Sequence, residues 1–131
     1  MKKVLVIDDD RIFIKLYEGQ FKLIRWNEPV ELLTALTSDE GMRLAQEKKP
    51  DLIFLDYNMK PEHGRDISKK LKTNPLTLSI PIILVTSERQ ENVKDAIYEQ
   101  FMGKPIKPNE MQKVVEHYLF KYRSPNLPPK Q

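Results

Sequence analysis

Three short stretches of the chain are continuously apolar. They span residues 4–7, 52–55 and 82–85 and read VLVI, LIFL and IILV. Because such a run has no polar face, it is typical of a strand buried on both sides, as in a parallel sheet covered by helices. A weaker strand candidate spans residues 32–36. The pattern therefore predicts a mainly parallel sheet with a helical layer on each face.

Between these runs the apolar residues recur every three or four positions, the spacing of an amphipathic helix. Helices are predicted at residues 11–22, 39–49, 64–73, 88–97 and 108–122, the last with an apolar face over 111–122. Ser38 is placed to cap the second of them, and Pro108 suits the first turn of the last. Strand and helix alternate throughout, which predicts a doubly wound α/β domain over residues 1–123. Residues 124–131, with three prolines and no apolar pattern, are expected to form a flexible tail.

Length and charge narrow the class of protein. A chain of 131 residues suits one domain. No apolar run approaches the ~20 residues of a membrane span, and Asp8 ends the first run too early for a signal peptide. The net charge is +3 and the basic residues are scattered, so no nucleic-acid partner is expected. Together with the absence of cysteine, these features favour a cytoplasmic protein that does not bind membranes.

Polar residues follow the apolar runs at the points where strands should end. Asp8–Asp10 follow the first run, Asp56 the second and Thr86 the third, and Lys104 precedes a proline further on. Parallel strands bring their carboxyl ends to one edge, where ligands bind in sheets of this kind. Clustered carboxylates need a cation or protons, and oxygen ligands without histidine or cysteine suit Mg²⁺. An aspartate in such a cluster can act as a nucleophile toward a phosphoryl group.

Each feature alone has an ordinary explanation, since an acidic triplet often begins a helix. Their combination resembles the receiver domain of two-component response regulators. The shared motifs are VLVIDDD at 4–10, PDLIFLD at 50–56 with Met59 and Gly64, PIILVTS at 81–87, and Lys104-Pro105. The resemblance covers residues 2–122. It implies a flavodoxin-like fold with five parallel strands in the order 2-1-3-4-5 and five helices.

The resemblance also implies a chemistry. Asp56 would accept a phosphoryl group from a phosphohistidine of a sensor kinase or phosphotransfer protein. The reaction would need Mg²⁺, bound by Asp8, Asp9, Asp56 and the backbone carbonyl of Asn58. Lys104 would pair with the phosphoryl group, and its bond to the next proline would be cis. The protein would assist its own phosphorylation and dephosphorylation but would not otherwise be an enzyme.

A switch is implied as well. The hydroxyl of Thr86 would bond the phosphoryl oxygens, and the ring of Phe101 would move with it. The face formed by residues 88–97, the fifth strand and the last helix would then change. Since no effector domain fits in the chain, we expect a single-domain, chemotaxis-like regulator that signals by binding a downstream protein.

Three features depart from the family pattern. Lys60 stands where the family usually has proline, and Pro61 follows one place late. Ser87 replaces the usual alanine beside the switch threonine. The stretch from Thr86 to Lys104 is shorter than usual, so the resemblance does not fix the length of the fourth helix or the role of Phe101.

Two other functions remain open from the sequence. A degenerate receiver would bind its partner without being phosphorylated. A haloacid-dehalogenase-like phosphatase would use Asp8 and Asp10 as its catalytic pair, as that family does after its first strand. The phosphatase hypothesis leaves Asp56 without a role, and the sequence lacks the acidic pair that this family would need after Lys104.

Overall fold

A computed structural model describes residues 1–121 of the chain. Its centre is one five-stranded sheet in the order β2-β1-β3-β4-β5, and every neighbouring pair is parallel. The strands are β1 (Lys2–Ile7), β2 (Val30–Ala35), β3 (Leu52–Asp56), β4 (Ile82–Thr86) and β5 (Gln100–Gly103). The predicted fold class and strand order are thus confirmed. Within residues 1–121 no helix is long and apolar enough to cross a membrane.

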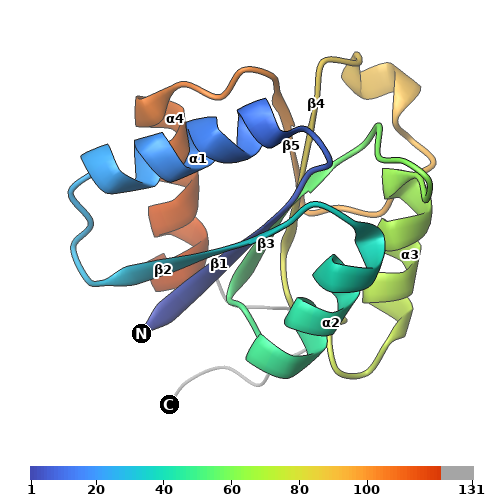
Figure 1. The fold of residues 1–131 in the computed structure, drawn as a ribbon, viewed down its shortest axis with the longest axis horizontal. Helices are drawn as coiled ribbons and strands as arrows, with labels where there is room; N and C mark the ends of the chain where they lie inside the picture. The colour runs from blue at the N-terminus through green and yellow to red at the C-terminus, as the bar shows by residue number, and fades with distance from the viewer. Residues whose placement is uncertain (122–131) are drawn as a thin grey trace.

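Helices cover both faces of this sheet (Figure 1). They are α1 (Arg11–Leu23), α2 (Ser38–Lys48), α3 (Gly64–Thr73) and α4 (Pro108–Glu116). Helix α4 continues into a π-helical turn, η2 (His117–Lys121). Helices α1 and α4 lie on one face, and α2 and α3 lie on the other. The right-handed crossovers of parallel sheets require this two-sided arrangement.

Two apolar clusters hold the layers together. In β1, Val4 and Val6 belong to the cluster beneath α1 and α4, whereas Leu5 and Ile7 belong to the cluster beneath α2 and α3. This division follows from the alternation of side chains along a strand. All four side chains are almost completely buried. The unbroken apolar runs of the sequence therefore do mark strands that are covered on both faces.

The helix predicted over residues 88–97 is wrong. Between β4 and β5 the chain forms only a single 3₁₀ turn, η1 (Gln90–Asn92), so residues 1–121 contain four α-helices and not the five implied by the resemblance. The reason lies in the apolar positions, which are confined to one turn. Of them only Val93 is fully buried, while Ile97 stays 43% exposed. Helices in proteins owe most of their stability to packing of an apolar face, and this segment offers too little of one.

Contacts with neighbouring elements replace the missing helix. The segment 87–99, called here the connector, runs beside α3. The hydroxyl of Tyr57 donates to Asp95 at 2.8 Å, and the backbone N–H of Ile97 donates to the hydroxyl of Ser68 at 3.0 Å. Lys72 of α3 forms an ion pair with Glu99 at 2.8 Å. The bond to Ser68 satisfies a backbone N–H that a helix would otherwise have paired within itself, and the two side-chain contacts tie the connector to its neighbours.

Smaller differences concern the ends of elements. Thr37, and not Ser38, caps α2, because its hydroxyl accepts a hydrogen bond from the N–H of Glu40 at 3.2 Å. Strand β2 begins and ends earlier than residues 32–36. Pro108 lies in the first turn of α4, as predicted. Tyr122 and the expected tail at residues 124–131 lie outside the described residues.

Candidate functional site

The carboxyl ends of the strands bring the predicted acidic residues together. Asp8 and Asp9 directly follow β1, and Asp56 is the last residue of β3. One carboxylate oxygen from each of the three lies within 4.8 Å of the others. Asp8 and Asp56 are buried, whereas Asp9 is exposed. The site is therefore an acidic cluster that is buried on one side and open on the other.

One lysine lies against this cluster. The ammonium of Lys104 is 3.1 Å from Oδ2 of Asp8 and 3.2 Å from Oδ1 of Asp56. Its backbone N–H donates to the carbonyl of Thr86 at 3.0 Å, which continues the β4–β5 ladder by one residue. The end of β5 thus directs the lysine into the site, where only 11% of its side chain is exposed.

Burial raises the pKa of both inner carboxyl groups. For Asp8, burial is the main cause, and it is opposed by the backbone N–H of Asp10 and by Lys104. For Asp56, burial is again the main cause and the charge of Asp8 adds to it, while Lys104 opposes both. One ammonium thus does not fully compensate two buried carboxylates. Such a cluster favours the binding of a further cation.

The donor set fits a hard divalent cation. Oδ2 of Asp8 is buried, and the partner that the described residues offer it is the Lys104 ammonium, 3.1 Å away. An open cavity of about 420 Å³ lies over the cluster, and Asp9, Asp56 and Asn58 are among the residues that line it. All available ligands are oxygens, which is the chemistry Mg²⁺ and Mn²⁺ prefer. Asp8, Asp9, Asp56 and Asn58 are the residues that could hold the ion.

Lys60 orients one of these ligands. Its backbone N–H donates to Oδ2 of Asp9 at 3.2 Å. Proline, which the family usually has at this position, carries no N–H and could not make this bond. The N–H of Lys60 therefore gives the exposed carboxylate a partner that a proline at this position could not provide. The bonds before Pro61 and Pro105 are both cis, the second as the resemblance implied.

Asp10 has a structural role. Its carboxylate accepts a hydrogen bond from the N–H of Ile12 at 2.9 Å and so caps α1. Its own N–H donates to Oδ1 of Asp8 at 2.9 Å. The cap explains how an acidic triplet can serve both a helix and a site. This capping role also weakens the phosphatase hypothesis, which needs Asp10 as a catalytic partner of Asp8.

The two residues of the predicted switch lie on neighbouring strands. Thr86 is completely buried, and its hydroxyl accepts a hydrogen bond from the N–H of Glu88 at 3.1 Å. Phe101 pairs with Leu84 across β4 and β5, and it is half-buried against the cluster beneath α2 and α3. The shortened connector therefore still places Phe101 in β5, beside the strand β4 that ends with Thr86.

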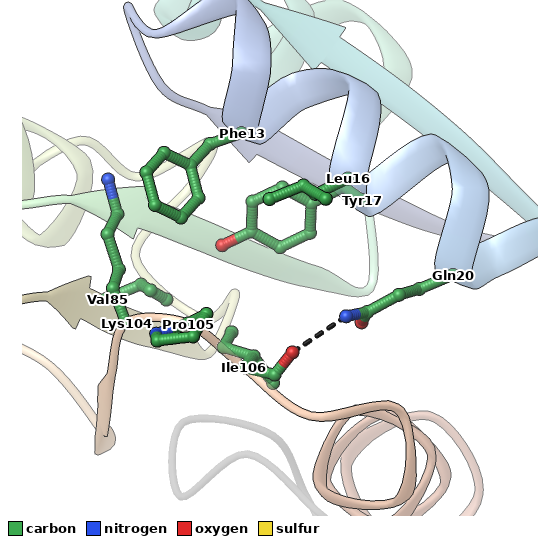
Figure 2. A pocket seen from close by; sticks show the side chains of 8 residues that line it. All are labelled: Phe13, Leu16, Tyr17, Gln20, Val85, Lys104, Pro105 and Ile106. Carbon is green, nitrogen blue, oxygen red and sulfur yellow. Dashed lines mark hydrogen bonds between the residues drawn. The ribbon is translucent and has the colours of Figure 1, made fainter.

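Phe13 is a site residue that the sequence alone did not indicate. It is the third residue of α1, and Figure 2 shows its ring beside the Lys104 ammonium, which lies 4.0 Å from the ring centroid. Phe13 also borders an apolar cavity of about 100 Å³ between α1 and the segment after β5. There Gln20 donates to the carbonyl of Ile106 at 2.7 Å, as Figure 2 shows. The only sequence signal was an aromatic residue one turn beyond the acidic triplet.

Comparison with known proteins identifies the family. A family profile described as the response regulator receiver domain matches residues 4–116. The chain belongs to this family, and it is a receiver domain of a two-component response regulator.

Three relatives show how far the similarity extends. The regulatory protein PhoP of Bacillus subtilis is 30% identical over 122 residues, which are 90% of this chain and 48% of PhoP. The polar-differentiation regulator DivK of Brucella anthropi is 25% identical over 90% of this chain and 96% of DivK. The crystal structure of the receiver domain of sensor kinase PA1611 from Pseudomonas aeruginosa has a TM-score of 0.79 at 17% identity, over 90% of this chain and 97% of that one. That last likeness concerns the fold alone. The chain thus spans about half the length of PhoP and nearly all of DivK.

Proposed function

We propose that Asp56 accepts a phosphoryl group in a reaction that depends on Mg²⁺. The observation that carries this proposal is the position of its carboxylate, at the end of β3, 3.2 Å from the Lys104 ammonium and within 4.8 Å of Asp8 and Asp9. Carboxylates and a cation around a nucleophilic oxygen form an arrangement suited to phosphoryl transfer. The PA1611 receiver, which has the same fold, contains a magnesium ion in its active-site cleft.

The transfer exchanges one bond to phosphorus for another. An oxygen of Asp56 attacks the phosphorus of a phosphohistidine on a sensor kinase or phosphotransfer protein. The bond from phosphorus to the imidazole nitrogen breaks, and the nitrogen keeps the electron pair. Lys104 then faces the phosphoryl oxygens and compensates part of their charge. A bound Mg²⁺ ion supplies the remaining positive charge that the crowded oxygens require.

The output is a change in a protein-binding face. The hydroxyl of Thr86, which accepts a hydrogen bond from the N–H of Glu88, donates its own hydrogen to a phosphoryl oxygen, and Phe101 adjusts beside it. The face formed by the connector, β5 and α4 then favours a second conformation. A downstream protein recognises that conformation. The domain acts as a phosphoacceptor, and its only catalysis concerns its own phosphorylation and dephosphorylation.

Phosphorylation by acetyl phosphate tests the proposal. With Mg²⁺ present, intact mass spectrometry should show one added phosphoryl group on the wild type and none on Asp56→Asn. Asp51→Asn is the matched control, because Asp51 precedes the same strand at the opposite end, where it accepts a hydrogen bond from the N–H of Lys3. Labelling of Asp56→Asn at the wild-type level would contradict the assignment. An unlabelled wild type would favour the degenerate receiver.

A further inference from the structure

The Lys104 ammonium has three N–H groups, and the structure shows three different neighbours for them. Two are the carboxylates of Asp8 and Asp56, at 3.1 and 3.2 Å. The third is the ring of Phe13, whose centroid is 4.0 Å away. A cation over an aromatic face at this distance is attracted by the ring quadrupole, most strongly where water is excluded. The ring therefore lies against the side of the ammonium that faces neither carboxylate.

The start of α1 sets the position of this ring. Because Asp10 caps the helix and its N–H is bonded to Asp8, the first turn of α1 is tied to the acidic cluster. Phe13 lies within that turn and borders both the cavity over the carboxylates and the apolar cavity beneath α1. The ring thus separates a polar compartment from an apolar one, and Lys104 lies at the boundary.

We propose that Phe13 is a positioning residue that holds the Lys104 ammonium over Asp56. A lysine side chain has a flexible stem and can place its charge in several directions. With the ring in place, the ammonium stays where a phosphoryl group on Asp56 would need it. This inference rests on the proposed phosphorylation of Asp56, and its site is the same.

The first test compares phosphorylation rates by acetyl phosphate at saturating donor and Mg²⁺. Phe13→Leu keeps an apolar side chain but removes the aromatic face, and should slow the reaction about three- to tenfold. Phe13→Tyr restores the face and should stay within about twofold of the wild type. In a Lys104→Met background, Phe13→Leu should have no further effect. Equal rates for the wild type and Phe13→Leu, or equal slowing in both backgrounds, would overturn the proposal.

A second test needs no phosphorylation, so it separates the positioning role of Phe13 from the proposed phosphorylation of Asp56. Reductive methylation reports how accessible each lysine is. In Phe13→Leu the modification rate of Lys104 should rise several-fold, and Phe13→Tyr should reverse the rise. Lys72 is the internal control, because its side chain is 13% exposed and paired with Glu99, compared with 11% for Lys104. An unchanged Lys104 rate would refute the positioning role even if the wild type is phosphorylated. If the Lys104 rate rises in Phe13→Leu but the wild type fails to be phosphorylated, only the proposed function is refuted.

Discussion

Substituting Gly64 by alanine should disturb the acceptor site more than any other glycine substitution in the chain. Gly64 begins α3, and its N–H donates to the carbonyl of Tyr57 at 2.9 Å. This bond folds the loop after β3 back onto the strand that carries Asp56. A Cβ atom at Gly64 would lie 2.7 Å from Cα and 2.8 Å from the carbonyl oxygen of Tyr57, and it would also meet the carbonyl oxygen of Asp56.

The magnitude follows from what these contacts are. All three atoms belong to the backbone, so no side chain can turn aside to make room. Ordinary carbon contacts need about 3.5–4.0 Å, so the loop and the strand end must separate by roughly 1 Å. Overpacking of this kind costs about 1–3 kcal/mol of unfolding free energy. Because the displaced backbone carries Asp56, the carboxylate should also lose its alignment with Lys104.

Urea denaturation and acetyl phosphate labelling measure the two effects. Gly64→Ala should unfold at lower urea and be phosphorylated at least several-fold more slowly than the wild type. Gly19→Ala is the control, because its Cβ would meet nothing within 4 Å on the exposed face of α1. In a helix interior, alanine should stabilise by about 0.5–1 kcal/mol. If Gly64→Ala matches the wild type in both stability and labelling rate, the close approach of Gly64 to β3 is wrong.

Three further predictions address the connector, the pKa values and the metal. Val93→Ala should destabilise by about 1–3 kcal/mol in urea, since Val93 is fully buried, whereas Ile97→Ala in the same segment should change stability little. Asp56→Asn should have a higher melting temperature than the wild type at pH 7, because burial raises the pKa of Asp56 and its charged form opposes folding. This difference in melting temperature should shrink on acidification. A difference that stays constant with pH would contradict the expected sign. Excess Mg²⁺ should raise the melting temperature of the wild type but not of Asp9→Asn, and EDTA should abolish labelling of Asp56.

The parts of the fold that could be predicted are those encoded by local pattern. The apolar runs ending at Ile7, Leu55 and Val85 have no polar face, so they predict buried parallel strands without reference to other segments. The acidic cluster then follows, because parallel strands bring their carboxyl ends to one edge. Asp8, Asp9 and Asp56 follow these runs and were predicted in this way, whereas Lys104 was predicted from the Lys104-Pro105 pair and the resemblance.

The parts that could not be predicted depend on contacts between distant segments. The spacing of Val93 and Ile97 fits one helical turn, but the bonds to Tyr57 and α3 that replace a helix have no local signature. The same is true of Phe13, whose role depends on where the end of β5 places Lys104. Thr37 and Ser38 are both good caps, and only the structure distinguishes them.

The missing helix also changes the surface that this receiver presents beside β5. A protein that recognises a groove between two helices flanking the fifth strand finds here only α4, because the connector presents a 3₁₀ turn instead. On this side of β5 the described residues therefore present irregular backbone in place of a second helix.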